Sequence, residues 1–249
     1  MARYKAILAY DGSGYYGFQR QAKRAQHPKH TVQTVVEEAL QGLGWQGRSI
    51  LAAGRTDTGV HASGQVIAFD LEWAHPPERL QAALNASLPP DVAVQAVQEV
   101  ASDFHPRFDA KARLYCYRIF CQPVRDPLRE RYAWRVWPGL DLQRLREAVA
   151  YLPGSHDFAA FGSSPQAGSS TIRNVLRADW QEDRDGLCFE ILANAFLFRM
   201  VRKLVGYQVT IGQGELAPEE LAYRLEDGRS ALVKNTAPPQ GLNLVEVMY

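Results

Sequence analysis

The stretch with the clearest chemical potential is GRTDTGVHA at residues 54–62, which holds one carboxylate in a polar turn. Asp57 is the only acid in residues 39–69, and apolar, strand-like runs lie on both sides of the turn. A lone Asp beside Arg55 is a poor metal cage, because hard cations need several oxygen ligands. It is a good positioned nucleophile or electrostatic anchor. The alternative is an Asp that caps a turn, since Asp and Gly are ordinary turn residues.

Neighbouring patterns resemble the signatures of other chemistry. Residues 12–17 (GSGYYG) satisfy G-x-G-x-x-G after a strand, with Glu37 near the place of a ribose-binding acid. That motif must open a helix, whereas a polar run follows here, and we expect Glu37 inside a later helix. Residues 57–59 spell the aspartic protease triplet, but no second triplet supplies the other carboxylate. His61 could orient or titrate beside Asp57, or be a hydrogen-bonded loop residue.

The composition is that of a soluble chain with an ample core. With 249 residues and 46% apolar residues, the chain could form one large domain or two small ones. Cys116, Cys121 and Cys188 form no C-x-x-C pair, which argues against a disulfide or zinc framework and for a reducing compartment. No signal-like segment and no uncharged apolar run of membrane-spanning length occurs. We therefore expect a cytoplasmic protein.

Basic residues are segregated, although the net charge is only +1. Residues 12–36 and 191–214 contain no acid. Such segregation predicts a positive face for a polyanion, although solvated faces give the same pattern. The candidate RNA-binding residues in these stretches are Arg20, Lys23, Arg24, Lys29, Arg199 and Lys203.

The hydrophobic periodicity predicts two halves with a similar order of elements. Strands and helices are mixed without strict alternation, which favours an α+β fold over a doubly wound sheet. We expect halves of residues 1–105 and 106–249, with their loops facing a common cleft. The predicted strands are 3–10, near 50, 65–71, 92–100, 113–121, 132–137, 172–180, 187–194 and 243–248, and the predicted helices are 31–43, 77–86, 141–152, 196–211 and 218–225.

Two elements of the second half carry further candidates. On the helix expected from residue 196, Arg199, Arg202 and Lys203 form one basic ridge at spacing i, i+3, i+4. Arg202 lies among apolar residues, so it is either a partly buried guanidinium that needs an anion or part of a solvated face. Tyr115 and Tyr117 share one face of a strand. They could stack on an unpaired base or belong to the core.

Taken together, six motifs resemble those of the tRNA pseudouridine synthases of the TruA type, in the family's order and from end to end. The resemblance implies an isomerase, without cofactor or metal, that converts uridine to pseudouridine in the anticodon stem-loop of tRNA, at positions 38–40. It also implies a homodimer with the pseudouridine synthase fold, in which two ferredoxin-like halves with mostly antiparallel sheets meet around a central cleft. The motifs are YDGS with YGFQR (residues 10–13 and 16–20), GRTDTGVHA (54–62), DFHPRF (103–108), ARLYCY (112–117), NAFL with MVR (194–197 and 200–202) and GLNL (241–244).

Carried onto the matching positions, the resemblance makes Asp57 the catalytic aspartate. Arg55 would lie beside the flipped base, Tyr115 would pack on the uracil, and Leu242 would line the pocket. Arg202 would pair with the Asp57 carboxylate. The target base must leave the stack to react, and an ionised Asp could attack ribose C1′ or uracil C6, or steady charge as the glycosidic bond breaks. Tyr115 could also move the proton that C5 loses.

Two other functions stay open at this point. A non-catalytic RNA-binding module on the same fold would need the basic face and Tyr115 but not Asp57. A hydrolase of a small phosphorylated substrate could use Asp57 as its nucleophile, although the cluster of carboxylates that holds Mg²⁺ is missing.

The sequence departs from the family pattern mainly at residues 22–30, which are longer and more basic than is typical. We predict that this segment contacts tRNA phosphates. Replacing Lys23, Arg24 and Lys29 together with Ala should weaken tRNA binding and reduce the slope of log affinity against log salt by roughly two to three, because each phosphate contact releases counterions. Filter binding over a salt series measures both quantities. Unchanged affinity and slope would contradict the prediction.

Overall fold

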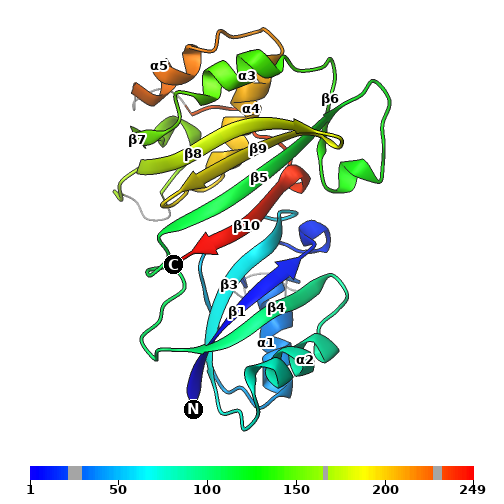
Figure 1. Ribbon diagram of the computed structural model, residues 1–249, viewed down its shortest axis with the longest axis vertical. Coiled ribbons are helices and arrows are strands. Elements are labelled where there is room, and N and C mark those ends of the chain that lie inside the picture. Colours follow the sequence, from blue (N-terminus) through cyan, green and yellow to red (C-terminus); the bar gives the residue numbers. More distant parts are fainter. Residues whose placement is uncertain (22–29, 165–167, 227–231) are drawn as a thin grey trace. The chain divides into compact units, whose positions relative to one another are not determined.

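The computed structural model describes residues 1–21, 30–164, 168–226 and 232–249. Two compact units make up the protein, residues 1–111 with 244–249 and residues 112–243. Each unit combines helices with a mostly antiparallel sheet (Figure 1), as the predicted α+β class requires. The sequence placed the whole closing strand in the second half, whereas the compact units place Leu244–Tyr249 with the first. No helix in the described ranges is long and apolar enough to span a membrane.

In the first unit, β1 is the centre of the sheet. It pairs antiparallel with β3 and β4, and β10 follows on the far side of β3. Alternate residues of β1 are buried, as expected for a strand with one covered face. Asn85 fastens α2 to β4 by exchanging two hydrogen bonds with the backbone of Val94, at 2.7 and 2.9 Å. The elements are β1 (Ala2–Tyr10), α1 (Val32–Gly42), β2 (Leu51–Ala52), β3 (His61–Leu71), α2 (Pro77–Ser87), β4 (Val92–Val100) and β10 (Leu242–Met248).

Helix α1 begins where the sequence predicts. The side chain of Thr31 caps it by accepting from the backbone N–H of Thr34. Its apolar stripe is buried, which confirms the periodicity of the predicted helix. Two polar side chains, Gln33 and Glu37, are buried with that stripe.

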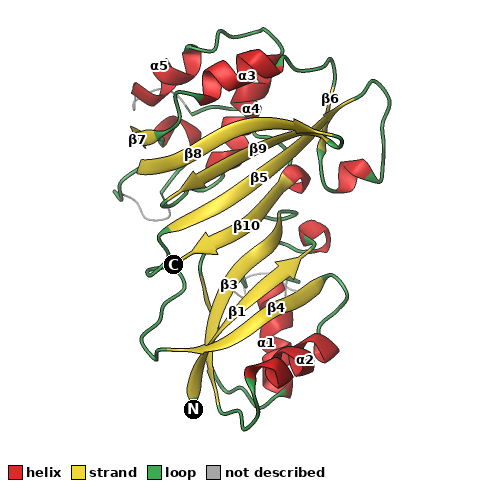
Figure 2. Ribbon diagram, in the orientation of Figure 1, coloured by secondary structure: helices red, strands yellow, loops and turns green. Residues whose placement is uncertain are grey.

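In the second unit, the sheet has the order β5-β9-β8-β7, and β6 pairs parallel with β5. Helices α3, α4 and α5 gather on one side of β8 (Figure 2). The short strand β7 has no counterpart among the predicted elements. The elements are β5 (Ala112–Cys121), β6 (Trp134–Val136), α3 (Leu142–Val149), β7 (Gly154–Asp157), β8 (Ile172–Asp183), β9 (Gly186–Ala193), α4 (Met200–Gly212) and α5 (Glu220–Glu226).

Several predicted boundaries of the second unit are wrong by a few residues, and two of them have a clear cause in the backbone. Helix α4 begins at Met200 rather than at residue 196, because Arg199 has a left-handed φ of 60° that no α-helix continues. The β8–β9 hairpin turns at Arg184 and Asp185, and Gly186 already pairs with Asp183. The φ of Gly186 is +123°, a conformation that favours glycine.

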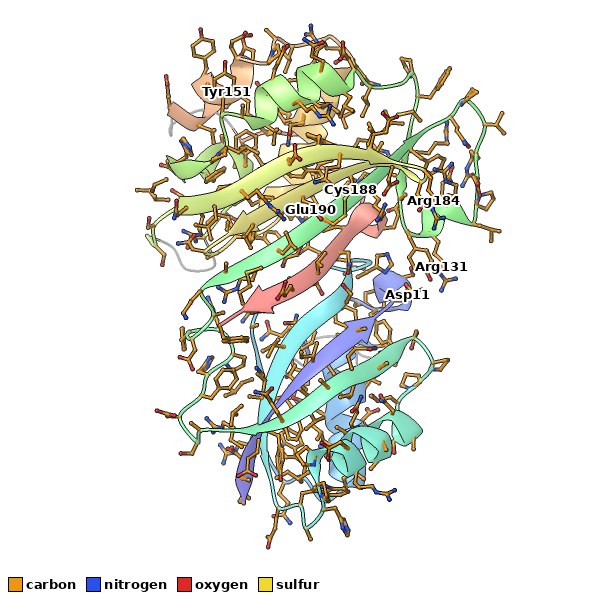
Figure 3. The ribbon with its side chains drawn as sticks, viewed as in Figure 1. Asp11, Arg131, Tyr151, Arg184, Cys188 and Glu190 are labelled. Carbon is orange, nitrogen blue, oxygen red and sulfur yellow. A yellow bond between two sulfur atoms is a disulfide. The ribbon has the colours of Figure 1, made fainter. Side chains whose placement is uncertain are left out.

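The expectation that no disulfide forms is also contradicted. The structure joins Cys116 of β5 to Cys188 of β9 (Figure 3), with their Cα atoms 6.3 Å apart. Their separation of 72 residues gives no recognisable spacing. Antiparallel pairing of β5 with β9 brings them together. Cys121 is a free thiol whose pKa is raised by burial.

The buried indole of Trp180 is the largest fully buried side chain of the protein's described core, and it has one side-chain hydrogen bond. Its Nε1–H donates to Oε1 of Gln208 on α4, at 2.7 Å, and the Gln208 amide donates to the carbonyl of Leu204. This pair fixes α4 on the sheet of the second unit.

We predict that Gln208→Leu lowers the free energy of unfolding by about 1–3 kcal/mol, because the indole N–H stays buried without an acceptor. Urea denaturation measures the change. Gln181→Leu, an exposed position on β8, is the matched control and should cost much less. Equal stability of Gln208→Leu and the wild type would show that the hydrogen bond from Trp180 to Gln208 makes no net contribution to the free energy of unfolding.

Candidate active site

The loop that carries Asp57 connects β2 to β3 and folds into a tight turn. The backbone N–H of Val60 donates to the carbonyl of Asp57 at 3.1 Å. Gly59 has φ +77°, as the third residue of a type II turn requires. Asp57 is half-buried, and Arg55 is exposed. Below the turn, the buried amide of Gln65 donates to the carbonyl of Gly54 at 3.1 Å, which secures the start of the loop.

Residues 10–20, which follow β1, hold the middle of this loop. The hydroxyls of Tyr10 and Thr56 share a buried hydrogen bond of 2.8 Å. The carbonyl of Thr56 accepts from the backbone N–H of Phe18 at 3.1 Å. Thr56 is therefore fixed through both its side chain and its backbone, and Asp57 follows directly in the chain.

Glycines let the two segments approach this closely. A Cβ on Gly12 would overlap the carbonyl of Val60. A Cβ on Gly17 would lie 2.8 Å from the carbonyl oxygen of Thr56, and the φ of Gly17 is +87°. Packing against the Asp57 loop thus explains the first and last glycines of the GSGYYG pattern.

His61 is the first residue of β3 and is buried. Its Nδ1 accepts from the backbone N–H of Gly12 at 3.0 Å and lies 3.2 Å from a carboxylate oxygen of Asp11. These contacts make His61 a further link between the Asp57 loop and the segment after β1.

Arg20, which the sequence assigned to RNA, has partners inside the unit. One guanidinium nitrogen donates to Glu37 Oε2 at 2.9 Å, and the other donates to the carbonyl of Arg48 at 3.0 Å. The sequence suggested Glu37 only as a ribose-binding acid and did not identify it as the partner of Arg20. A signal was present, because Gln33 and Glu37 stand at i, i+4 on the apolar side of a predicted helix.

In the second unit, Tyr115 and Tyr117 share a face of β5 but differ in surroundings. Tyr117 is buried, and its hydroxyl donates to the carbonyl of Pro238 at 2.7 Å, so it belongs to the core. Burial also raises its pKa. Tyr115 is half-buried and packs edge to face on Phe196, with ring centroids 5.0 Å apart. Of the two, only Tyr115 keeps part of its side chain accessible.

Arg202 is held by the chain segment that leads into β10. Its Nε–H donates to the carbonyl of Ala237 at 2.8 Å, and its own carbonyl accepts from the Ala237 N–H at 3.0 Å. Gly206, one turn further on α4, lets the segment cross closely, since a Cβ there would lie 2.6 Å from the carbonyl oxygen of Asn235. Leu242 follows this segment and is buried.

The basic ridge of α4 begins at the helix start. Arg199 precedes the first turn, and its guanidinium lies 4.9 Å from the ring centroid of the exposed Phe198. Lys203 is half-buried, and burial together with Arg199 lowers its pKa. A cation that loses solvation in this way favours an anionic partner.

The other predicted RNA contacts, Lys23, Arg24 and Lys29, lie outside the residues that the structure describes. Within the described ranges, no three His, Cys, Asp or Glu side chains are grouped to hold a metal ion.

Comparison with known proteins adds an independent finding. A family model described as tRNA pseudouridine synthase matches residues 6–109 and 148–249, which include Asp57, Arg202 and Leu242. Tyr115 lies between the matched ranges. Three bacterial proteins named tRNA pseudouridine synthase A match all of this chain. That of Pseudothermotoga lettingae is 40% identical over 250 residues and is covered completely. That of Listeria innocua is 40% identical over 253 residues, also completely covered. That of Citrifermentans bemidjiense is 39% identical over 250 residues, with 98% of it covered.

The close approach of residue 12 to the loop generates a stability prediction. Gly12→Ala should lower the free energy of unfolding by about 1–3 kcal/mol or more, because the new methyl group displaces the carbonyl of Val60. Gly14→Ala is the control, since its Cβ would have only a carboxylate oxygen of Asp91 nearby, at 4.0 Å. Chemical denaturation compares the two. Similar stability of both variants would refute the close packing.

Proposed function

Because the chain belongs to the tRNA pseudouridine synthase family, we propose that it isomerises uridine to pseudouridine in the anticodon stem-loop of tRNA. The family match and the full-length relatives support the reaction and the tRNA substrate. The observation that carries the site is the rigidly held loop around Asp57. A catalytic group is effective only when its position is fixed before the substrate arrives.

Asp57 is the proposed catalytic residue. The reaction breaks the bond between ribose C1′ and uracil N1 and forms a bond from C1′ to C5, while C5 loses a proton and N1 gains one. An ionised carboxylate can take part by attacking C1′ or C6, or by stabilising charge on the ribose as the bond breaks. The loop supports this role because hydrogen bonds from Tyr10 and Phe18 hold Thr56, the residue directly before Asp57.

Arg55, Tyr115, Arg202 and Leu242 are proposed to bind the target uridine. A uridine taken out of its stack needs a flat partner for its ring and an apolar wall beside it. The half-buried ring of Tyr115 and the buried side chain of Leu242 have these properties. The exposed Arg55 can lie beside the flipped base, and the bond from Arg202 Nε to Ala237 fixes the plane of that guanidinium.

Arg199 and Lys203 are proposed to bind tRNA phosphates. Both are cations at the start of α4, where backbone N–H groups also favour anions. Lys23, Arg24 and Lys29 are proposed for the same role on sequence alone.

We also propose a homodimer that works in the cytoplasm. The resemblance to TruA-type enzymes supports the dimer. The need for tRNA as substrate supports the compartment.

The decisive variant is Asp57→Asn, which removes the charge and keeps the shape. We expect turnover to fall by at least about 10³-fold, because the group acts on the reacting atoms, while tRNA affinity stays within a few-fold of the wild type. Carbodiimide adducts on tRNA, which mark the mass-neutral conversion to pseudouridine, give the rate, and filter binding gives the affinity.

Thr58→Ala is the matched control, since Thr58 is exposed in the same loop, and it should keep its activity. If wild-type protein forms no pseudouridine on competent tRNA but binds it, the protein is an RNA-binding module. If Asp57→Asn retains full activity, another group performs the chemistry.

A further inference from the structure

Glu37 is a buried acid to which the proposed reaction gives no role. It is 3% exposed and lies on the apolar side of α1. A carboxylate in such a place is costly unless hydrogen bonds and a counter-charge compensate its lost hydration. Here Oε1 accepts from the side chain of Gln33 at 2.7 Å and from the backbone N–H of Ile50 at 3.1 Å. Oε2 accepts from Arg20 at 2.9 Å.

The donors belong to segments that border the Asp57 loop. Ile50 immediately precedes β2, and β2 leads directly into the loop. Arg20 lies at the end of the segment that follows β1, and Phe18 of this segment donates a backbone hydrogen bond to Thr56 of the loop. Gln33 joins the two, because its side-chain oxygen accepts from the backbone N–H of Arg20 at 2.9 Å, and its backbone N–H donates to the carbonyl of Phe18, also at 2.9 Å.

We propose that Glu37 is a positioning residue of the reaction, which acts with Arg20 to fix the frame that holds the Asp57 loop. The inference rests on the proposed role of Asp57. The Glu37 carboxylate connects two segments: Ile50, which precedes the strand that enters the loop, and Arg20, in the segment that packs on the loop. The guanidinium of Arg20 serves this frame and is not a ligand of tRNA phosphate.

Stability alone does not account for this arrangement. Apolar side chains of similar size often replace a buried ion pair without loss of stability. A network of directional hydrogen bonds does what an apolar cluster does not, because each bond restricts both the distance and the angle between the groups that it joins. For a catalytic group, a displacement of about 1 Å costs about 10²-fold in rate.

The test compares Glu37→Gln and Arg20→Met with two controls of the same charge change. Glu38→Gln alters the adjacent, exposed acid of the same helix, and Arg48→Met alters an exposed arginine whose carbonyl, not its side chain, meets Arg20. Rates at saturating tRNA, the KM for tRNA, and tRNA affinity over a salt series are measured for each, with Asp57→Asn as the inactive reference.

We expect Glu37→Gln and Arg20→Met to lower kcat by about 10- to 100-fold, with the KM, the tRNA affinity and its salt slope within about two-fold of the wild type. The double variant should lose little more than whichever single variant has the larger loss of kcat, because both changes break one network. Both controls should behave as the wild type. Thermal melting shows that each variant is folded, and if Glu37→Gln is not, Arg20→Met decides, since that side chain is 48% exposed.

Three results would overturn an assignment, and they are distinguishable. Full kcat in Glu37→Gln or in a folded Arg20→Met, with Asp57→Asn inactive, removes the positioning role and leaves the proposed function intact. Weaker tRNA binding and a smaller salt slope in Arg20→Met alone make Arg20 a phosphate ligand. An active Asp57→Asn refutes the proposed function itself.

Discussion

The first unit depends on the close packing of two backbone segments that leave neighbouring strands. β1 and β3 pair antiparallel with Tyr10 opposite Ala62, so the chain after β1 must run beside the chain before β3. Side chains larger than hydrogen at Gly12 and Gly17 would hold the segments apart. Because both positions are glycine, the backbones of the two segments come into direct contact. Their N–H and C=O groups then hydrogen-bond to each other although neither segment is a strand. The shape of the candidate catalytic loop is therefore imposed by its neighbours.

In the second unit, a glycine of α4 likewise allows a backbone segment to pack closely. Gly206 leaves room for the chain at Asn235, and Arg202, one turn earlier, satisfies the carbonyl of Ala237 at the crossing. In both units a glycine admits a backbone segment that has no regular structure, and a neighbouring polar group completes its hydrogen bonds. Rigidity at the candidate sites comes from this combination, in places where regular secondary structure ends.

Much of the fold was predictable, because hydrophobic periodicity reports which face of an element is buried. The stripe of α1, the alternation of β1 and the hairpin of β8 with β9 follow from it, and the motifs pointed to Asp57 directly. Features that depend on distant partners were not predictable. The start of α4 is set by one left-handed residue, the bond between Cys116 and Cys188 depends on strand register, and the burial of Glu37 depends on donors from three segments.

The strand β10 has a consequence for synthesis of the chain. Residues 244–249 belong to the first unit, where β10 lies beside β3 and the backbone N–H of Lys111 donates to the carbonyl of Met248 at 2.8 Å. During translation, residues 1–111 leave the ribosome well before these last residues do. Until then β3 is paired on this edge only with the short strand β2, at Ile67 and Ala68, and the rest of the edge is an open template for other strands. The first unit is thus begun before the second and completed after it, so that the second unit is synthesised while the first one still lacks strand β10.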